Sequence, residues 1–371
     1  MELRRNSNTI IRRWILTFRE IDFPLLLLTV AVSVFGIINM YGVAGPSSPF
    51  FQKQILFVVL GVGVMILFSF FNYRYLKNYS LPITIAYIIV VGLLVVPFFL
   101  PAIRGVRSWI RFGSLTLEPV ELAKLVLIAL MAKYFSQRHI HIRQLRHIIV
   151  SGIYIGIPLL IVLAQPDLGS AIIFLCIWLG ILLASGMSRK QLFILLSCGL
   201  IVAYVGWLFV LKPYQKARIL SFINPSADPR GAGYNLIQSK IAIGSGYWFG
   251  NGLGKGSQTK LGFLPEPHND FVIASIADHF GFAGLSFVVL ATAAIISRVL
   301  IIGERTANNF GKLFCLGMAV FLLSHAFISA GVNLGILPVT GLPFPFVSYG
   351  GSNYIALMLG LGIVQSIKRY H

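Results

Sequence analysis

Charged side chains are scarce in this sequence of 371 residues. They make up 11% of the chain against 57% hydrophobic residues, and the mean hydropathy is +0.84. A soluble domain carries about 25% charged residues to cover its surface, so this composition excludes a water-soluble protein. The excess apolar surface requires lipid as its solvent. The sequence therefore predicts an all-α polytopic membrane protein.

Cysteine is nearly absent as well. Cys176, Cys198 and Cys315 each lie in an apolar run, and none belongs to a C-x-x-C pair. This pattern argues against a disulfide framework or a cysteine-ligated metal, and it predicts three buried packing residues. Low-complexity tracts and soluble-domain patterns are also missing, so we expect a single integral-membrane domain over residues 1–371.

Long apolar runs are what the sequence has in abundance. A spanning helix needs about 20 mostly apolar residues, and ten runs approach or exceed that length. They lie near 23–40, 54–71, 81–100, 121–136, 148–164, 169–187, 191–211, 271–297, 312–336 and 352–367. The eighth is long enough to tilt or break, and a large loop at 212–270 precedes it.

The charge balance is strongly basic, with 30 Lys and Arg residues against 11 Asp and Glu residues and a net charge of +19. These basic residues are scattered through short loops, so we interpret them as topology signals and lipid contacts, with no nucleic-acid partner. The basic tail 1–22 is predicted to be cytoplasmic, as is the C-terminus with Lys368 and Arg369. The loop at 212–270 is then extracytoplasmic.

Two predicted outer segments carry basic residues against this bias. One contains Arg107 and Arg111, and the other, at 212–270, contains Arg218 and Lys240. Basic residues on the outer side suggest an anionic ligand, although anionic lipid headgroups would also explain them.

Carboxylates are few, and most lie near the predicted outer face. Glu118, Glu121 and Lys124 share one helical stripe at the start of the fourth span, which fits a structural ion pair or an active site equally well. Asp278 lies inside the eighth span, where an unpaired charge costs at least ~2.5 kcal/mol. Asp270 lies just before that span, either as a general base at the water–lipid boundary or as a helix N-cap.

Glycine is concentrated at residues 231–262, which contain nine of them. Neither the phosphate-loop spacing nor G-x-G-x-x-G is met there, so we predict a flexible, shaped outer segment and no nucleotide site. No organic cofactor is expected.

Seven motifs follow one another along the chain. They are GVRSWI (105–110) with EPVELAK (118–124), QPDLG (165–169), YQKARI (214–219), DPRGAGYN (228–235), QSKIAIGSG (238–246), PEPHNDF (265–271) and PFPFVSYGGS (343–352). In this order they resemble the SEDS family (shape, elongation, division and sporulation), and most closely its RodA branch. The resemblance covers nearly the whole chain.

The resemblance implies a peptidoglycan glycosyltransferase, a hexosyltransferase that polymerises lipid II into glycan strands at the outer face of the bacterial cytoplasmic membrane during cell elongation. It implies a class B penicillin-binding transpeptidase and the elongation machinery as partners. It also implies that Asp270 is the essential aspartate of the family. The residues that would line or support the same cavity are Arg107, Trp109, Glu121, Lys124 and Lys240.

The expected reaction needs a base for the acceptor sugar's 4-hydroxyl and positive charge for the departing pyrophosphate. Asp270 would be the base, and a single dominant carboxylate fits an inverting transfer better than a retaining pair. The candidates for the pyrophosphate are Arg107, Arg111, Arg218 and Lys240, and Ser348 of the last motif joins the substrate-binding residues. A divalent cation, Mg²⁺ or Mn²⁺, is suggested by the resemblance alone.

The chain departs from the family pattern at three places. Glu118 replaces a usual Gln, Asn269 replaces a usual Thr, and Asp278-His279 stands where two glutamates are frequent. These changes bear on the tuning of the cavity and on any metal site.

Two other functions remain open from the sequence. A lipid II flippase would need its key charges across the membrane midplane, whereas here they gather at the predicted outer boundary. A scaffold that only recruits the transpeptidase would leave Asp270 dispensable.

Overall fold

The structure, a computed structural model, describes residues 21–101, 108–137 without 114, 145–209 and 233–370, with the isolated positions 216, 220 and 222. Ten long helices in these ranges correspond to the ten predicted spans, which confirms the predicted fold class. They are α2 (Phe23–Ala44), α3 (Pro49–Phe70), α5 (Leu81–Val95), α6 (Pro119–Ser136), α7 (Leu145–Ala164), α8 (Leu168–Ala184), α9 (Arg189–Phe209), α13 (Val272–Arg305), α14 (Asn309–Leu334) and α15 (Gly351–Arg369).

Seven helical segments are long and apolar enough to cross a membrane by length and composition, and α8 is a shorter apolar helix. The two other long helices, α6 and α15, are more polar because other helices surround them. α6 has Glu121, Lys124 and Lys133 among its buried residues, and α15 has Asn353 and Gln365. An interior helix needs hydrogen-bonding partners for its polar groups, and it does not need a lipid-compatible surface.

Shorter elements connect the spans. They are α4 (Arg74–Asn78), the 3-10 helix η1 (Val96–Phe99), the strands β1 (Ile110–Phe112) and β2 (Leu115–Leu117), and the helices α11 (Tyr234–Ser245) and α12 (Ser257–Lys260). β1 and β2 form an antiparallel hairpin in which Arg111 faces Thr116. The described part of the predicted loop 212–270 therefore contains two helices.

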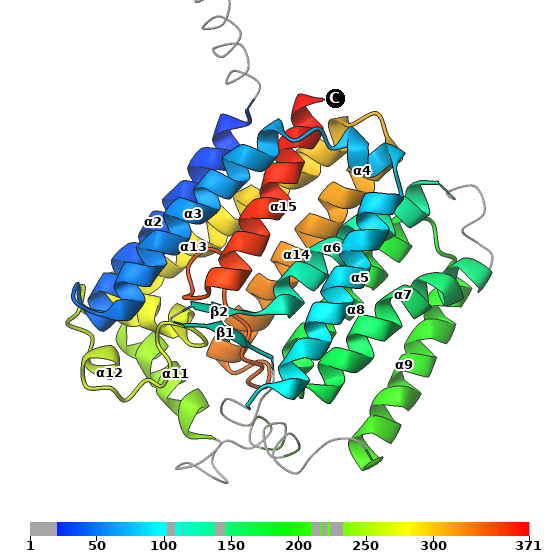
Figure 1. Ribbon diagram of the computed structural model, residues 1–371. Helices are drawn as coiled ribbons and strands as arrows, with labels where there is room; N and C mark the ends of the chain where they lie inside the picture. Colours follow the sequence, from blue (N-terminus) through cyan, green and yellow to red (C-terminus); the bar gives the residue numbers. More distant parts are fainter. Residues whose placement is uncertain are drawn as a thin grey trace, which may run out of the picture.

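The spans form one bundle whose two ends differ (Figure 1). We call the end where α2 begins and α15 ends the terminal end, and the opposite end, with β1, β2, α11 and α12, the hairpin end. α15 packs along α3, α13 packs along α14 and α2, and α6 packs against α5 and α14. α13 also breaks at Gly281, which has φ 65° and ψ −157°, as the length of the eighth apolar run predicted.

Asp22 links the start of α2 to α13 and α15 at the terminal end. Its carboxylate accepts a hydrogen bond from the Leu25 N–H and forms ion pairs with Arg298 (2.7 Å) and Lys368 (2.8 Å). Burial alone would raise the pKa of Asp22, but hydrogen bonds from these two cations outweigh burial and hold the pKa below its ordinary value. Its backbone N–H donates to the Gln365 side chain, 2.7 Å away.

The three cysteines are free, but the prediction that all are buried was wrong. Cys315 is buried, Cys176 is half-buried and Cys198 is exposed. Cys198 lies on α9, whose most apolar stretch has none of its residues buried within the chain. An apolar run in a membrane protein can face lipid as readily as protein, and sequence hydropathy does not distinguish the two.

Candidate active site

Asp270 lies at the hairpin end, in a tight turn immediately before α13. The turn is closed by Glu266, whose carbonyl accepts from the N–H groups of Asn269 and Phe271. The N-cap position belongs to Phe271, whose carbonyl accepts the N–H of Ser275 at 3.0 Å. Asp270 is therefore not the N-cap residue of α13. Its half-buried side chain faces the segment after α14, with Oδ2 4.0 Å from the place of a Cβ on Gly341.

Asn333 holds the backbone of Asp270 in place from α14. Its side-chain Nδ2 donates to the carbonyls of Asp270 and Ser329, both at 2.8 Å, and its Oδ1 accepts from the N–H of Ala274 at 3.0 Å. Ser239 of α11 donates to the backbone carbonyl of Asn333 at 2.7 Å. Asn333 is fully buried, so α11, α13 and α14 meet at this one residue. The sequence reasoning missed it, although an asparagine inside an apolar span was a detectable signal.

Ser348 ties the last motif to the turn that carries Asp270. Its hydroxyl donates to the carbonyl of Asn269 at 2.9 Å and accepts from the N–H of Phe344 at 2.8 Å. The N–H of Tyr349 donates to the carbonyl of His268 at 2.8 Å. The Ser348 hydroxyl is thus engaged by protein partners. This geometry lets Ser348 position the turn beside Asp270.

The predicted ion pair between Glu121 and Lys124 is present in the first turns of α6. Lys124 Nζ lies 2.8 Å from Glu121 Oε1, and both side chains are fully buried. Asn353 Nδ2 donates to the other carboxylate oxygen of Glu121 at 2.9 Å. Lys124 Nζ also lies 3.2 Å from Nε2 of His325, a fully buried residue of α14 that the sequence reasoning did not single out.

His325 connects this ion pair to the Asp270 turn. Its Nδ1 lies 3.3 Å from the carbonyl of Pro343, the first residue of the segment that Ser348 bonds to Asn269. Polar contacts and peptide bonds therefore connect Glu121, through Lys124, His325 and the segment 343–348, to Asn269, the residue before Asp270. The predicted site residues on this route are Glu121, Lys124 and Ser348.

Glu118 and Trp109 form a second group, at the β1–β2 hairpin. The Glu118 N–H donates to Ser352 Oγ at 2.9 Å, and Trp109 hydrogen-bonds the Glu118 carboxylate. Burial raises the pKa of Glu118 to about 8, and the neighbouring carboxylates of Glu121 and Asp167 add to the rise.

Asp167 caps α8 beside this group. Its Oδ1 accepts the N–H of Ser170 at 2.9 Å, and burial raises its pKa. The two carboxylates that precede α6 and α8 are thus both held at the hairpin end, close to Lys124.

The remaining candidates are spread along the same end. Arg111 is an exposed residue of β1, and Lys240 is an exposed residue of α11 whose side chain covers Gly335, the C-cap of α14. Arg107 and Arg218 lie outside the described residues. Asp278, the other candidate inside a span, accepts hydrogen bonds from the N–H and the hydroxyl of Thr259, so protein donors engage its carboxylate.

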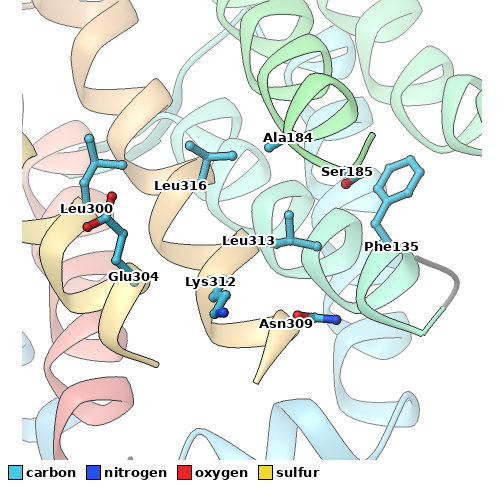
Figure 2. A pocket seen from close by; sticks show the side chains of 10 residues that line it. Phe135, Ala184, Ser185, Leu300, Glu304, Asn309, Lys312, Leu313 and Leu316 are labelled. Carbon is cyan, nitrogen blue, oxygen red and sulfur yellow. The ribbon is translucent and has the colours of Figure 1, made fainter. Parts of the chain in front are cut away.

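An apolar groove of about 400 Å³ opens between α8 and α14 near the hairpin end. Its wall includes Leu323 and Phe327 of α14 and also Thr340, which precedes Gly341 in the chain. A second pocket, of about 430 Å³, lies at the terminal end and is lined by residues such as Glu304 and Lys312 (Figure 2). That pocket contains none of the candidate residues.

The whole bundle corresponds to a known family. The family model for FtsW, RodA and SpoVE, described as a cell cycle protein, matches residues 14–371. The chain belongs to this family. The resemblance predicted from the seven motifs is confirmed.

Relatives in the FtsW/RodA/SpoVE family are similar over nearly their full length. The peptidoglycan glycosyltransferase MrdB of Escherichia coli K12 is 34% identical over 354 residues, which cover 95% of this chain and 94% of MrdB. The probable peptidoglycan glycosyltransferase FtsW of Trichlorobacter lovleyi is 32% identical, with 94% of this chain and 93% of the relative covered.

Solved structures from the family share the fold. A chain from a structure on the coordination of polymerization and crosslinking by a peptidoglycan synthase complex has a TM-score of 0.80 and 30% identity. The match covers 94% of this chain and 98% of that one. The rod shape determining protein RodA of Thermus thermophilus has a TM-score of 0.70 and 26% identity, with coverages of 94% and 97%.

The pKa of Glu118 gives a test at a position where SEDS proteins usually have Gln. The ordinary pKa is 4.5 and the folded-state pKa is about 8, so the folded protein keeps a proton that the unfolded chain releases. Stability contributed by this proton is present below the unfolded pKa and is lost as pH rises through about 8. Glu118→Gln should remove this loss, because the amide resembles the protonated acid.

The measurement is the thermal unfolding midpoint of both proteins at about pH 6 and about pH 9. We expect the gain in stability of Glu118→Gln over the wild type to be larger at the higher pH, because the loss in the wild type begins above the unfolded pKa of 4.5 and is complete above about 8. An equal difference at both values would show that Glu118 does not titrate in this interval.

Proposed function

We propose that this chain is a peptidoglycan glycosyltransferase that polymerises lipid II during cell elongation, with Asp270 as its general base. Relatives that match nearly the whole chain are named peptidoglycan glycosyltransferases. The observation that carries the assignment of Asp270 is its anchored position at the hairpin end. Asn333 holds its backbone and Ser348 holds its neighbour, as a base held in fixed geometry requires.

Asp270 takes the proton of the acceptor sugar's 4-hydroxyl as that oxygen attacks the donor sugar. The bond from the donor sugar to its pyrophosphate breaks, and the pyrophosphate leaves with the electron pair. An attack from the face opposite the leaving group inverts the sugar's configuration and needs one base and no glycosyl-enzyme intermediate. The Asp270 carboxylate, which faces Gly341, would be that base.

Positive charge must meet the pyrophosphate as it leaves. Arg111 and Lys240, both exposed at the hairpin end, are suited to contact a diphosphate that approaches from the membrane surface. Arg107 and Arg218 are proposed for the same task from their motifs. Trp109 and the Glu121–Lys124 pair would support the substrate site around Asp270. The pair would do so through its contact with His325.

The lipid tail of the substrate needs an apolar slot that opens to the bilayer. The groove between α8 and α14 is suited to this task, because apolar side chains line it and its wall includes Thr340, the residue before Gly341. We assign one isoprenoid tail to this groove. A headgroup attached to that tail would lie next to Asp270.

We propose that the hairpin end is extracytoplasmic and that both termini are cytoplasmic. The described residues of the terminal end carry basic side chains on short connections, such as Arg74, Lys77, Arg189 and Lys190, which fits the positive-inside rule. The membrane is then the bacterial cytoplasmic membrane, with the active site on its outer side.

A class B penicillin-binding transpeptidase and the elongation machinery are the proposed protein partners. The support is that a chain with the same fold was solved as part of a peptidoglycan synthase complex. Membrane lipids and lipid II complete the set of partners.

A divalent cation, Mg²⁺ or Mn²⁺, is proposed to share the pyrophosphate charge. In the part of the chain that the structure describes, no three His, Cys, Asp or Glu side chains are grouped to hold a metal ion. The described residues therefore provide no such group, and a cation would take ligands from the diphosphate of the substrate. We expect EDTA to slow polymerisation and Mg²⁺ or Mn²⁺ to restore it, and an unchanged rate in EDTA would contradict the proposal.

The function is tested by polymerisation of labelled lipid II in vitro. The purified chain is combined with its cognate transpeptidase, whose active serine is blocked. Glycan ladders on a gel are the expected result. Absence of ladders from an intact complex would contradict the polymerase assignment, and lipid II flipping in liposomes would then be measured.

A further inference from the structure

The break in α13 sets the depth of the surrounding segments in the membrane. Residues 282–305, beyond Gly281, extend about 36 Å at 1.5 Å per residue. A hydrocarbon layer is about 30 Å thick, so this part of α13 spans it alone. Because the far end of the helix carries Glu304 and Arg305, Gly281 lies at the opposite hydrocarbon boundary, toward the hairpin end.

The segment that follows α11 repairs this break by pairing with α13. The N–H groups of Phe282 and Ala283 donate to the carbonyls of Tyr247 (2.8 Å) and Trp248 (3.0 Å). On the other side of the break, the N–H of Asn251 donates to the carbonyl of Asp278 at 2.9 Å. Near lipid, backbone polar groups must be satisfied within the protein, and this pairing supplies what the broken helix lacks.

The glycines of this segment make the close approach possible. A Cβ on Gly246 would lie 1.9 Å from the carbonyl oxygen of Ala277, and one on Gly250 would lie 2.2 Å from that of His279. The glycine-rich stretch that the sequence suggested to be flexible is thus packed tightly against a helix. Main-chain hydrogen bonds hold its backbone on α13.

Three consecutive aromatic residues project from this fixed backbone. Tyr247, Trp248 and Phe249 are 82%, 68% and 83% exposed, and we call them the aromatic wedge. The Trp248 ring meets that of Phe282 edge to face, with centroids 5.3 Å apart. Phe282 is itself 56% exposed and is followed along α13 by the 68% exposed Leu290, so the wedge continues an apolar surface that faces lipid.

We propose that the aromatic wedge is inserted into the bilayer at the headgroup–hydrocarbon boundary, where it binds phospholipid. Tyr and Trp rings favour this depth, because their apolar bodies enter the lipid while their polar atoms stay hydrated. The position of the break places the wedge at that depth, and its continuity with the lipid-facing side of α13 identifies lipid as the occupant.

The wedge also fixes the height of the candidate base, a consequence that rests on the proposed function. The helical segment 272–280 starts two residues after Asp270 and is held by the backbone pairing at Asp278. A wedge anchored in lipid thereby keeps Asp270 level with the headgroup layer. The pyrophosphate of a lipid-linked sugar lies in that layer.

The depth of the wedge is measured by fluorescence quenching in nanodiscs. Wild type and Trp248→Phe are reconstituted in phospholipid brominated either near the glycerol backbone or near the chain end. We expect the Trp248 contribution, taken as the difference between the two proteins, to be lost more completely with the shallow bromines. Trp178→Phe is the matched control, because Trp178 is buried and its indole donates to Ser151, and it should leave the depth dependence unchanged.

A Trp248 contribution that neither lipid quenches would overturn the proposal. A photoreactive phenylalanine analogue at Phe249, in the complex with the transpeptidase, identifies the neighbour directly. An adduct with phospholipid supports the proposal, and an adduct with the transpeptidase alone overturns it.

Polymerisation activity distinguishes the proposal for the aromatic wedge from the proposal for Asp270. Replacing all three wedge residues with serine leaves the backbone pairing possible and should reduce polymerisation. Unchanged activity in that variant, with quenching as expected, would refute only the effect on Asp270. If Asp270→Asn kept full activity while Trp248 was quenched, the proposed base would fail and the wedge would stand.

Discussion

Asp270→Asn should lower the rate of lipid II polymerisation by about a hundredfold to ten-thousandfold, the range that a general base contributes. The amide keeps the shape of the side chain but cannot accept the proton of the attacking hydroxyl. Asn333 binds the backbone carbonyl of Asp270 and Ser348 binds that of Asn269. The turn should therefore keep its structure in the variant. Glycan ladders and the binding of the transpeptidase are measured in parallel.

The matched control is Glu266→Gln in the same turn. Glu266 contributes its backbone carbonyl to the turn, and its side chain lies 3.4 Å from the His268 imidazole, so the same chemical change there should leave polymerisation near the wild-type rate. Equal losses in both variants would indicate damage to the turn and not loss of a base. Wild-type ladders from Asp270→Asn would disprove the mechanism.

The location of the ionisable site residues bears on the flippase alternative. Glu118 and Asp167 precede α6 and α8, and the Glu121–Lys124 pair occupies the first turns of α6, all at the hairpin end. A flippase requires key charges that are accessible from both sides of the membrane. The buried Asp22 at the terminal end is held in ion pairs that join helix ends, so the candidate groups at the hairpin end favour chemistry at one surface.

The spans could be predicted because an apolar run of about 20 residues has few other uses. The hydropathy of a run does not indicate which side of the helix contacts protein. For this reason Cys198 was wrongly expected to be buried. The ion pair between Glu121 and Lys124 was predictable because the spacing of three residues is a local feature of the helix.

The residues that organise the site were harder to find from sequence. Asn333 and His325 are single polar residues in an apolar run, and their partners Asp270, Lys124 and Pro343 come from distant parts of the chain. Only the packing of α14 against α6 and the segments at the hairpin end brings them together. Sequence periodicity describes one helix at a time, so it does not contain this information.

Lys124→Met should destabilise the protein by about 3–5 kcal/mol, the usual effect of removing one partner from a buried ion pair. The substitution leaves the Glu121 carboxylate fully buried with only the Asn353 amide as a hydrogen-bond donor among its known contacts. His325 would lose its neighbour at 3.2 Å as well. The thermal unfolding midpoint in detergent and the yield of monodisperse protein measure the effect. Lys190→Met, an exposed lysine at the start of α9, is the control and should change stability by less than about 0.5 kcal/mol.

The double variant Glu121→Gln with Lys124→Met tests whether the ion pair affects the reaction or only the stability of the fold. It removes both charges, so no uncompensated ion stays buried, and stability should recover most of the loss. A protein that regains stability but does not polymerise lipid II would show that the pair acts on the reaction, through His325 and the segment that backs Asp270. A stable double variant with wild-type activity would reduce the pair to a structural contact. Wild-type stability in Lys124→Met itself would mean that water or another cation reaches Glu121, contrary to its burial.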